Sequence, residues 1–279
     1  LNQSIPKSHN ITTAQVYSAV IEAERKGEYL GACVQIIPHI TDEIKNRIRK
    51  IAEEEKLDFL IVECGGTVGD IESLPFLEAL RQMRVEEGPQ NVIFVHVTLA
   101  PSLDVVGEQK TKPTQHSAQE LRRIGIQPDF LAVRCTTPLE EKTKKKIALF
   151  TNVTANDVLS CHDVKSIFQV PQILYDQGIM DSLFTKFGKV GMVNASANWD
   201  KWNSIAESMI NHEDQKVRIA MVGKYVTLAD SYVSVNHALK HAGAKLGKSV
   251  EIDWIDSESM TDFNNLSKYD GILVPGGFG

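Results

Sequence analysis

Closely spaced cysteines are absent from this sequence. Its four cysteines, Cys33, Cys64, Cys135 and Cys161, are widely separated and form no CxxC motif. A zinc site or a thioredoxin-like site needs such a motif, so neither is expected. Three of the four lie in or beside apolar stretches, which is typical of small core residues in a reducing compartment. We therefore predict a cytoplasmic protein.

Long apolar runs and an excess of positive charge are also absent. No run approaches the roughly 20 apolar residues that a membrane-spanning helix needs, and no charged-then-apolar signal opens the chain. The 30 lysines and arginines are outnumbered by 36 aspartates and glutamates, which gives a net charge of −6. General nucleic-acid binders are basic, so neither nucleic acid nor membrane is an expected partner.

A Walker A glycine loop is missing as well, so phosphate binding would depend on side chains. The chain begins at Leu1, and its last residues, ILVPGGFG, predict a strand and a turn with no helix after them. Parallel strands are joined by crossover connections that are usually helices. We therefore expect the sequence to be cut from a longer protein at both ends.

Strand and helix patterns alternate along the chain, which predicts a doubly wound, mostly parallel α/β sheet. The strands expected in the first part are residues 32–37, 59–62, 91–99, 130–134 and 148–153. The helices expected around them are residues 12–26, a helix that opens at Thr41, and residues 74–85, 117–124 and 138–146. Residues 104–115 are expected to form a polar loop.

A second α/β pattern begins after the charged run at residues 212–216. Strands are expected at residues 217–222, 250–255 and 271–274, with a helix at 230–246. We therefore predict a first α/β domain over residues 1–193, a linker over residues 194–216, and the start of a second α/β domain over residues 217–279.

The stretch FLIVECGGTVGDIESLPF, residues 59–76, carries three carboxylates after an apolar run. The run predicts a buried strand, and open α/β sheets bind ligands at the carboxyl ends of their strands. Glu63 is a hard oxygen ligand suited to Mg²⁺ beside phosphate oxygens. Asp70 and Glu72 fit a ligand-binding loop or an ordinary turn.

A basic loop, KTKPTQ, follows the next expected strand. In an extended loop, Lys110 and Lys112 would point the same way and could meet one polyanion such as a triphosphate. Pro113 would stiffen the loop, and the Gln115 amide could contact a base or ribose. The alternative is a solvated surface loop. The lysines at 142, 144, 145 and 146 are expected to be mostly a solvated helix face, from which one or two reach a site.

Two further signals are weak by themselves. His162 and Asp163 could belong to a hydrolytic triad, but no nucleophile with a matching motif stands out. Pro275-Gly276-Gly277 follows an expected strand, and its backbone N–H groups could stabilise an oxyanion or simply form a turn.

Taken together, the chain resembles the CTP synthase family. The resemblance is carried, in the family's order and over nearly the whole chain, by YLGACVQIIPHITDEIK, VECGGTVGDIESLPFLEALRQ, GEQKTKPTQHSAQELRRIGIQPD, KKIALFTNV, DVKSIFQVP and YDGILVPGGFG. VECGGTVGDIESLPF together with KTKPTQHS is highly specific. The family has an amidoligase domain related to P-loop dethiobiotin synthetases, followed by a class I glutamine amidotransferase domain. This chain would lack the P-loop lysine and the glutaminase Cys, His and Glu.

The resemblance implies a carbon–nitrogen ligase of pyrimidine biosynthesis that aminates UTP to CTP. ATP, with Mg²⁺, would phosphorylate the uracil 4-oxygen, and ammonia from glutamine would displace that phosphate. The family is inhibited by CTP, activated by GTP, and expected to form homotetramers. The 279-residue piece alone would be inactive.

The resemblance also implies residue roles, which group by ligand. UTP and the CTP triphosphate would be bound by Lys110, Thr111, Lys112, Pro113, Thr114, Gln115 and Lys146. Mg²⁺ would be held by Glu63, inhibitory CTP by Asp70, Ile71 and Glu72, and the ATP base by His162, Asp163 and Val164. Gly276 and Gly277 would form the glutamine-binding oxyanion turn.

Two other functions remain open. Another P-loop glutamine-dependent amidoligase, such as a cobyrinate amidase, should lack the KTKPTQ loop. A non-catalytic nucleotide-sensing or filament-forming subunit should lack a P-loop and a glutaminase cysteine in its full-length gene.

Overall fold

A computed structural model describes residues 5–103, 108–189, 199–210, 215–224, 226, 229–260 and 263–276. The chain divides into two compact units. One contains residues 1–163 and 177–193, and the other contains residues 164–176 and 194–279. Both are mixed α/β with a parallel sheet, as predicted. The predicted domain limits at residues 193 and 216 stay predictions.

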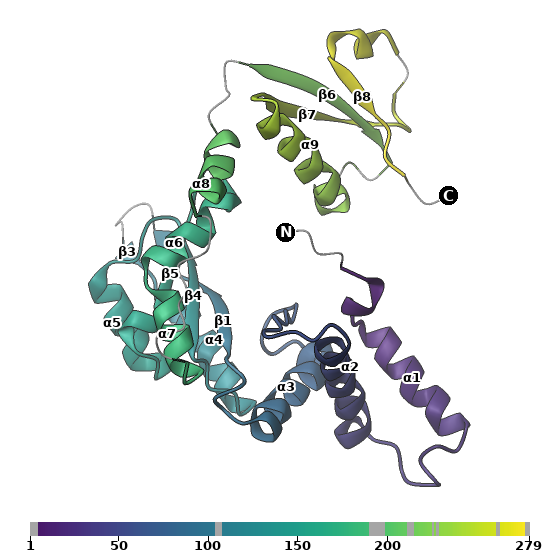
Figure 1. The fold of residues 1–279 in the computed structure, drawn as a ribbon, viewed down its shortest axis with the longest axis vertical. Helices are drawn as coiled ribbons and strands as arrows, with labels where there is room; N and C mark the ends of the chain where they lie inside the picture. Colours follow the sequence, from purple (N-terminus) through teal and green to yellow (C-terminus); the bar gives the residue numbers. More distant parts are fainter. Residues whose placement is uncertain are drawn as a thin grey trace. The chain divides into compact units, whose positions relative to one another are not determined.

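The sheet of the first unit has three parallel strands (Figure 1). They are β1 (Val95–Leu99), β4 (Phe130–Cys135) and β5 (Val158–His162), in the order β1-β4-β5. Helices α4 (Lys112–Arg123) and α5 (Glu141–Thr151) follow β1 and β4. A small antiparallel pair, β2 (Ser102–Leu103) and β3 (Glu108–Gln109), lies between β1 and α4.

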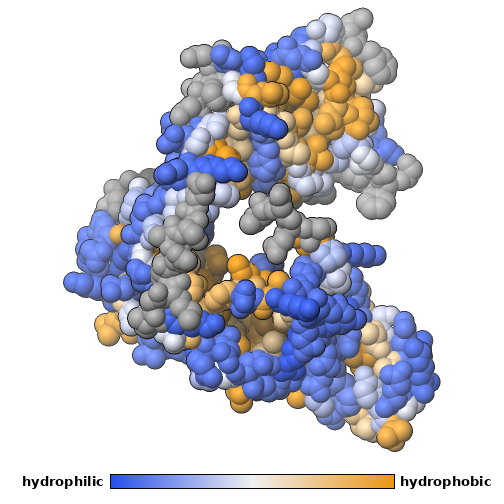
Figure 2. All heavy atoms as spheres, in the orientation of Figure 1, coloured by the Kyte–Doolittle hydropathy of each residue, from blue (hydrophilic) through white to orange (hydrophobic). Residues whose placement is uncertain are grey.

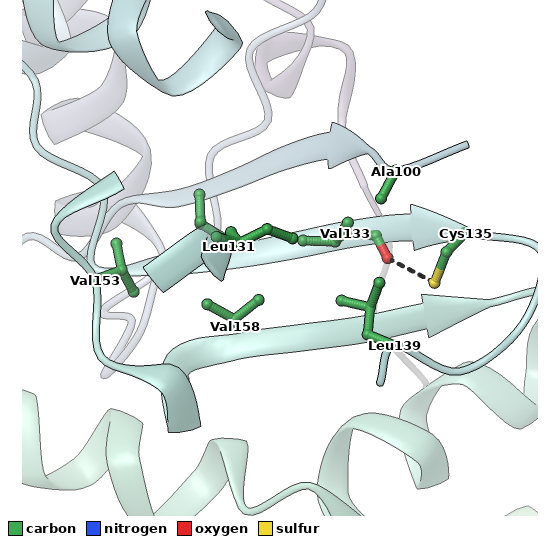
Figure 3. Close-up of a cluster of buried hydrophobic side chains, with 8 residues drawn as sticks. Ala100, Leu131, Val133, Cys135, Leu139, Val153 and Val158 are labelled. Atoms are coloured by element: carbon green, nitrogen blue, oxygen red, sulfur yellow. Dashed lines mark hydrogen bonds between the residues drawn. The ribbon is translucent and has the colours of Figure 1, made fainter. Parts of the chain in front are cut away.

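The core of this unit lies on one face of β4 and β5, because alternate residues of a strand point to the same side. Leu131, Val133 and Cys135 face that side together with Val158, and α5 contributes the fully buried Ile147. Figure 3 shows the side chains of Leu131, Val133, Cys135 and Val158 on the strands, with the Cys135 thiol directed at the Val133 carbonyl. The same core positions the ends of the strands.

A second buried cluster of the first unit is formed mainly by α1 (Thr13–Arg25), α2 (Thr41–Glu54) and α3 (Leu74–Glu87). Thr12 and Gln15 form a capping box at the start of α1. The predicted apolar stripe of α2 is confirmed, since Ile44 and Ile48 are buried against α1 and α3.

The first unit also contains the short helical elements η1 (Lys7–His9), η2 (Ile36–Ile40), η3 (Ile71–Ser73), η4 (Ala155–Asp157) and α7 (Ile179–Lys186). The elements η5 (Ile167–Gln169) and α6 (Val170–Asp176) belong to the second unit. No helix in the described ranges is long and apolar enough to cross a membrane.

The strands predicted for the second unit are confirmed. They are β6 (Lys216–Gly223), β7 (Ser249–Asp256) and β8 (Gly271–Leu273), all parallel in the order β7-β6-β8. Helix α9 (Val233–Lys245) packs on β7, where a β-carbon added at Gly243 would lie 2.6 Å from Val250. The unit also contains α8 (Trp199–Ser208), η6 (Ala229–Tyr232) and η7 (Phe263–Lys268). Figure 2 shows apolar residues at the surface of this unit, and Ile272 and Val274 are among the exposed ones.

Three predicted strands are wrong. Residues 32–37 lead into η2 and residues 59–62 are irregular, so neither joins a sheet. Phe59 and Ile61 are 49% and 94% exposed, because no described strand pairs with this segment and an apolar run without a partner cannot form a sheet. Residues 148–151 continue α5, since Thr143, Ile147 and Thr151 are buried at helical spacing.

Candidate functional site

The carboxyl edge of the β1-β4-β5 sheet brings together segments that are far apart in the sequence. Beyond β1, the Ala100 N–H donates to the Arg134 carbonyl at 2.8 Å. Beyond β5, the Asp163 N–H donates to the Cys135 carbonyl at 3.1 Å. Parallel α/β sheets bind ligands at this edge. The predicted nucleotide loop and the predicted ATP segment therefore lie at the same edge.

Strand β3 is anchored to the start of α5 through Gln109. The buried Gln109 amide donates to the Pro138 carbonyl at 2.9 Å, and its oxygen accepts the Glu140 N–H at 3.0 Å. The Lys110 N–H donates to the Pro101 carbonyl at 2.8 Å. Since residues on either side of Gln109 in an extended segment point away from it, Glu108 and Lys110 are presented on the other side.

Cationic side chains from the β3 segment and α5 act on one carboxylate, that of Glu108. Lys110 Nζ lies 2.5 Å from Glu108 Oε2. This contact lowers the pKa of the Glu108 carboxyl, and the charges of Lys146 and Lys142 lower it further. The charges of Lys110 and Lys146, two of the predicted triphosphate residues, thus both act on Glu108, which nothing in the sequence had indicated.

The rest of the KTKPTQ motif is helical, which corrects the expected extended loop. Helix α4 begins at Lys112, because proline is favoured in the first turn and Pro113 stands there. Lys112 therefore does not continue an extended segment from Lys110, and its ammonium lies 5.8 Å from the Phe150 ring centroid.

Three residues of the motif are buried and hold the start of α4. Gln115 Nε2 donates to Thr111 Oγ1 at 2.9 Å, so the Gln115 amide is engaged within the helix. Thr114 is completely buried, and its hydroxyl donates to the Leu99 carbonyl at 3.0 Å. These contacts fix the first turn of α4 against the end of β1. Backbone N–H groups in such a turn have no intrahelical partner and can bind anions.

The predicted ATP segment follows β5 and contacts an arginine of β4. Arg134 donates to the Cys161 carbonyl at 2.7 Å and pairs with Asp163 at 2.8 Å. His162 is half-buried, and its Nδ1 atom is buried with no hydrogen-bond partner in the described structure. Val164 is half-buried. The sequence analysis missed Arg134, although a charged residue at the end of the apolar strand FLAVRC was a usable signal.

The carboxylates at residues 63–72 lie in an irregular loop. Glu63 is exposed, and no cluster of three or more metal-ligating residues occurs in the ranges that the structure covers. Asp70 accepts the Thr67 N–H at 2.8 Å, so its side chain closes a turn, while Ile71 and Glu72 are exposed. The loop is attached to α3 and α4, because Cys64 and Val68 pack against the apolar cluster of Leu77, Leu121 and Ile126.

The geometry gives limited support to the predicted oxyanion turn at Gly276 and Gly277. Gly276 follows β8, is exposed, and has open space around it. Gly277 lies outside the described residues.

Burial raises the pKa of the Cys64, Cys135 and Cys161 thiols, so none of these three is a thiolate nucleophile at neutral pH.

Comparison with known proteins gives two family matches. A model described as the CTP synthase N-terminus matches residues 1–189, and one described as glutamine amidotransferase class I matches residues 227–279. Two curated relatives named CTP synthase, from Thermococcus gammatolerans and Pyrococcus abyssi, are each 53% identical over 281 aligned positions. A CTP synthase from Thermus thermophilus is 48% identical over 282 positions.

These alignments cover 100% of this chain but 52%, 51% and 50% of the respective relatives. The chain therefore spans about half the length of the curated relatives that it matches.

Proposed function

The chain belongs to the CTP synthase family, and from this premise we propose that the protein containing it aminates UTP to CTP with ATP and with ammonia from glutamine. The observation that carries the proposal is the position of Lys110 at the carboxyl edge of the first sheet, where its N–H donates to the Pro101 carbonyl at 2.8 Å beside the first turn of α4. A lysine and the first turn of a helix at this edge suit a triphosphate.

The triphosphate of UTP, or of CTP, is bound by the ammonium groups of Lys110 and Lys146 and by the first turn of α4. Lys112 and Pro113 begin that turn. The buried residues Thr111, Thr114 and Gln115 act mainly by holding the turn in place. The negative charge spread over several phosphate oxygens is stabilised by these fixed donors.

We infer that ATP binds at His162 and Asp163, which lie at the same edge of the sheet, and at the adjoining Val164. Its γ-phosphoryl group is transferred to the 4-oxygen of UTP, and ammonia then displaces phosphate at C4. Both steps develop charge on phosphoryl oxygens, which lysine side chains stabilise.

Mg²⁺ accompanies the nucleotides and neutralises charge on the transferred phosphoryl group. It commonly takes one or two protein carboxylates, with phosphates and water as the other ligands. The single exposed carboxylate of Glu63 fits that requirement. The exposed Ile71 and Glu72, with Asp70 shaping the turn, bind CTP as an inhibitor.

These carboxylates give a test with a built-in comparison. Glu63→Ala is expected to abolish synthesis, whereas Glu72→Ala is expected to keep synthesis and raise the CTP concentration needed for inhibition. Initial rates with and without CTP would measure both effects. Loss of inhibition in Glu63→Ala, with synthesis retained, would contradict the division of roles.

Ammonia is supplied by glutamine in the region that matches class I amidotransferases, residues 227–279. The backbone N–H groups of Gly276 and Gly277 stabilise the oxyanion formed from glutamine. Ammonia rather than ammonium must attack C4, so a water-poor route favours the reaction. GTP activation, homotetramer formation and a cytoplasmic location complete the proposal.

The direct test is conversion of UTP to CTP by the full-length protein. Lys110→Ala is expected to abolish conversion, while Lys145→Ala, which removes an exposed lysine of α5, is the matched control and should retain it. Normal turnover by Lys110→Ala would contradict the site. Failure of the wild-type protein to bind UTP or CTP would favour another glutamine-dependent amidoligase.

A further inference from the structure

Glu108 places a negative charge beside Lys110, where the nucleotide phosphates are expected. We propose that Glu108 stays paired with Lys110 when nucleotide is absent and must leave it when UTP or CTP binds, so that this side chain weakens nucleotide binding. The inference rests on the proposed function, because it assumes that Lys110 binds a triphosphate.

The first argument is geometric. The Lys110 ammonium has three N–H donors, and the one directed at Glu108 Oε2 at 2.5 Å is not available to a phosphate, while the Glu108 carboxylate would repel a phosphate bound beside it. The backbone on which both residues stand is fixed, since Gln109 is held by the Pro138 carbonyl and the Glu140 N–H. The Glu108 side chain is 53% exposed. It can therefore turn into solvent without any change in the fold.

The second argument is electrostatic. Lys110, Lys146 and Lys142 all lower the pKa of the Glu108 carboxyl, so Glu108 is an anion at neutral pH. A carboxylate is a weaker partner for lysine than a triphosphate with several negative oxygens, so the nucleotide wins the exchange. The competition still costs affinity. An exposed ion pair of this kind changes a binding constant by about two- to fivefold.

A carboxylate in this position also changes how the site responds to salt. Screening weakens an exposed pair at high ionic strength. The contribution of Glu108 should therefore be largest at low salt and fall as salt is added. A side chain that only shaped the loop would not give this dependence.

The experiment is calorimetric titration of the full-length protein with UTP, CTP and inorganic tripolyphosphate at low and high salt. The variant is Glu108→Gln, which keeps the shape and removes the charge. The matched control is Glu120→Gln, which removes a carboxylate paired with Arg123 on α4. Thermal unfolding checks that each variant is folded.

We expect Glu108→Gln to bind all three ligands about two- to fivefold more tightly at low salt, with a smaller gain at high salt, and Glu120→Gln to match the wild type. Unchanged or weaker binding by Glu108→Gln would overturn the inference. If the Lys110→Ala variant also binds the ligands as tightly as the wild type does, the proposed function fails as well. If Lys110→Ala loses binding and Glu108→Gln does not gain it, only the inference fails.

Discussion

Single residues in this chain connect elements that are distant in the sequence. Asp129 accepts two hydrogen bonds from Arg84 of α3, at 2.5 and 3.0 Å, and one from the Phe94 N–H at 2.8 Å. Its side chain is only 15% exposed. A carboxylate so enclosed is stabilising only while all its partners remain, because an uncompensated charge left behind is costly.

We predict that Asp129→Asn lowers the free energy of unfolding by about 2–3 kcal/mol, since Arg84 would lose its counter-charge. Urea unfolding monitored by circular dichroism measures the change. Glu120→Gln, an exposed pair on α4, is the comparison and should cost less than about 1 kcal/mol. Equal losses in the two variants would show that burial of the Asp129 pair is unimportant.

His96 gives a pH-dependent prediction. It is 7% exposed, lies 2.8 Å from the Ser117 hydroxyl, and burial lowers its pKa below the usual value. Below about pH 6.5 this histidine is therefore protonated in the unfolded chain but stays neutral in the folded chain. The free energy of unfolding consequently falls as the pH decreases from that value.

Unfolding measured at pH 7.5, 6.5 and 5.5 should show a smaller loss of stability toward acid in His96→Gln than in the wild type. The difference between the two proteins removes the contributions of the other histidines. Parallel curves for the two proteins would contradict the prediction.

Not every important residue could be found from the sequence. Lys110 and Lys146 were predicted to share a ligand, which stays a prediction, and the charges of both lower the pKa of the Glu108 carboxyl. Glu108 and Arg134 were missed, because their positions depend on which backbone carbonyls and charges surround them after folding. The buried states of Thr114 and Gln115 were missed because their motif was expected to be an extended loop.

At the scale of elements, β3 and α5 act as one support for the site. The Gln109 side chain makes this connection through backbone groups of residues 137–140. Removing the amide would leave carbonyl and N–H groups without partners.

We predict that Gln109→Ala lowers the free energy of unfolding by about 1–3 kcal/mol and weakens UTP binding without touching the nucleotide. Gln119→Ala, at an exposed position of α4, is the matched control and should change neither property. Unfolding and UTP titration on the same samples measure both. Unchanged UTP affinity in a destabilised Gln109→Ala protein would show that β3 does not support the site.

The element predictions failed where pairing partners decide the outcome. Strands β4, β6 and β7 were predicted correctly from the sequence, because their apolar segments pair with other strands in the sheets. Residues 59–62 have the same composition, but no described strand pairs with them. Residues 148–151 also looked like a strand, yet they extend a helix until Asn152 ends it in the left-handed conformation, with φ of 58°.

At the scale of the whole molecule, the chain joins a region that matches the CTP synthase N-terminus, residues 1–189, to a region that matches class I glutamine amidotransferases, residues 227–279. The family and the α/β fold could be predicted because specific motifs extend over nearly the whole sequence. The exact unit boundaries could not, since residues 164–176 group with the second unit although they lie within the first family match.

The central claim is that the carboxyl edge of the first sheet binds a pyrimidine nucleoside triphosphate through Lys110. The most direct measurement is the dissociation constant of UTP for the full-length protein, with CTP as competitor, in the wild type and in Lys110→Ala. We expect CTP to displace UTP, and Lys110→Ala to weaken the binding of both nucleotides by about tenfold or more with an unchanged melting temperature. UTP binding of equal strength in a folded Lys110→Ala protein would contradict it.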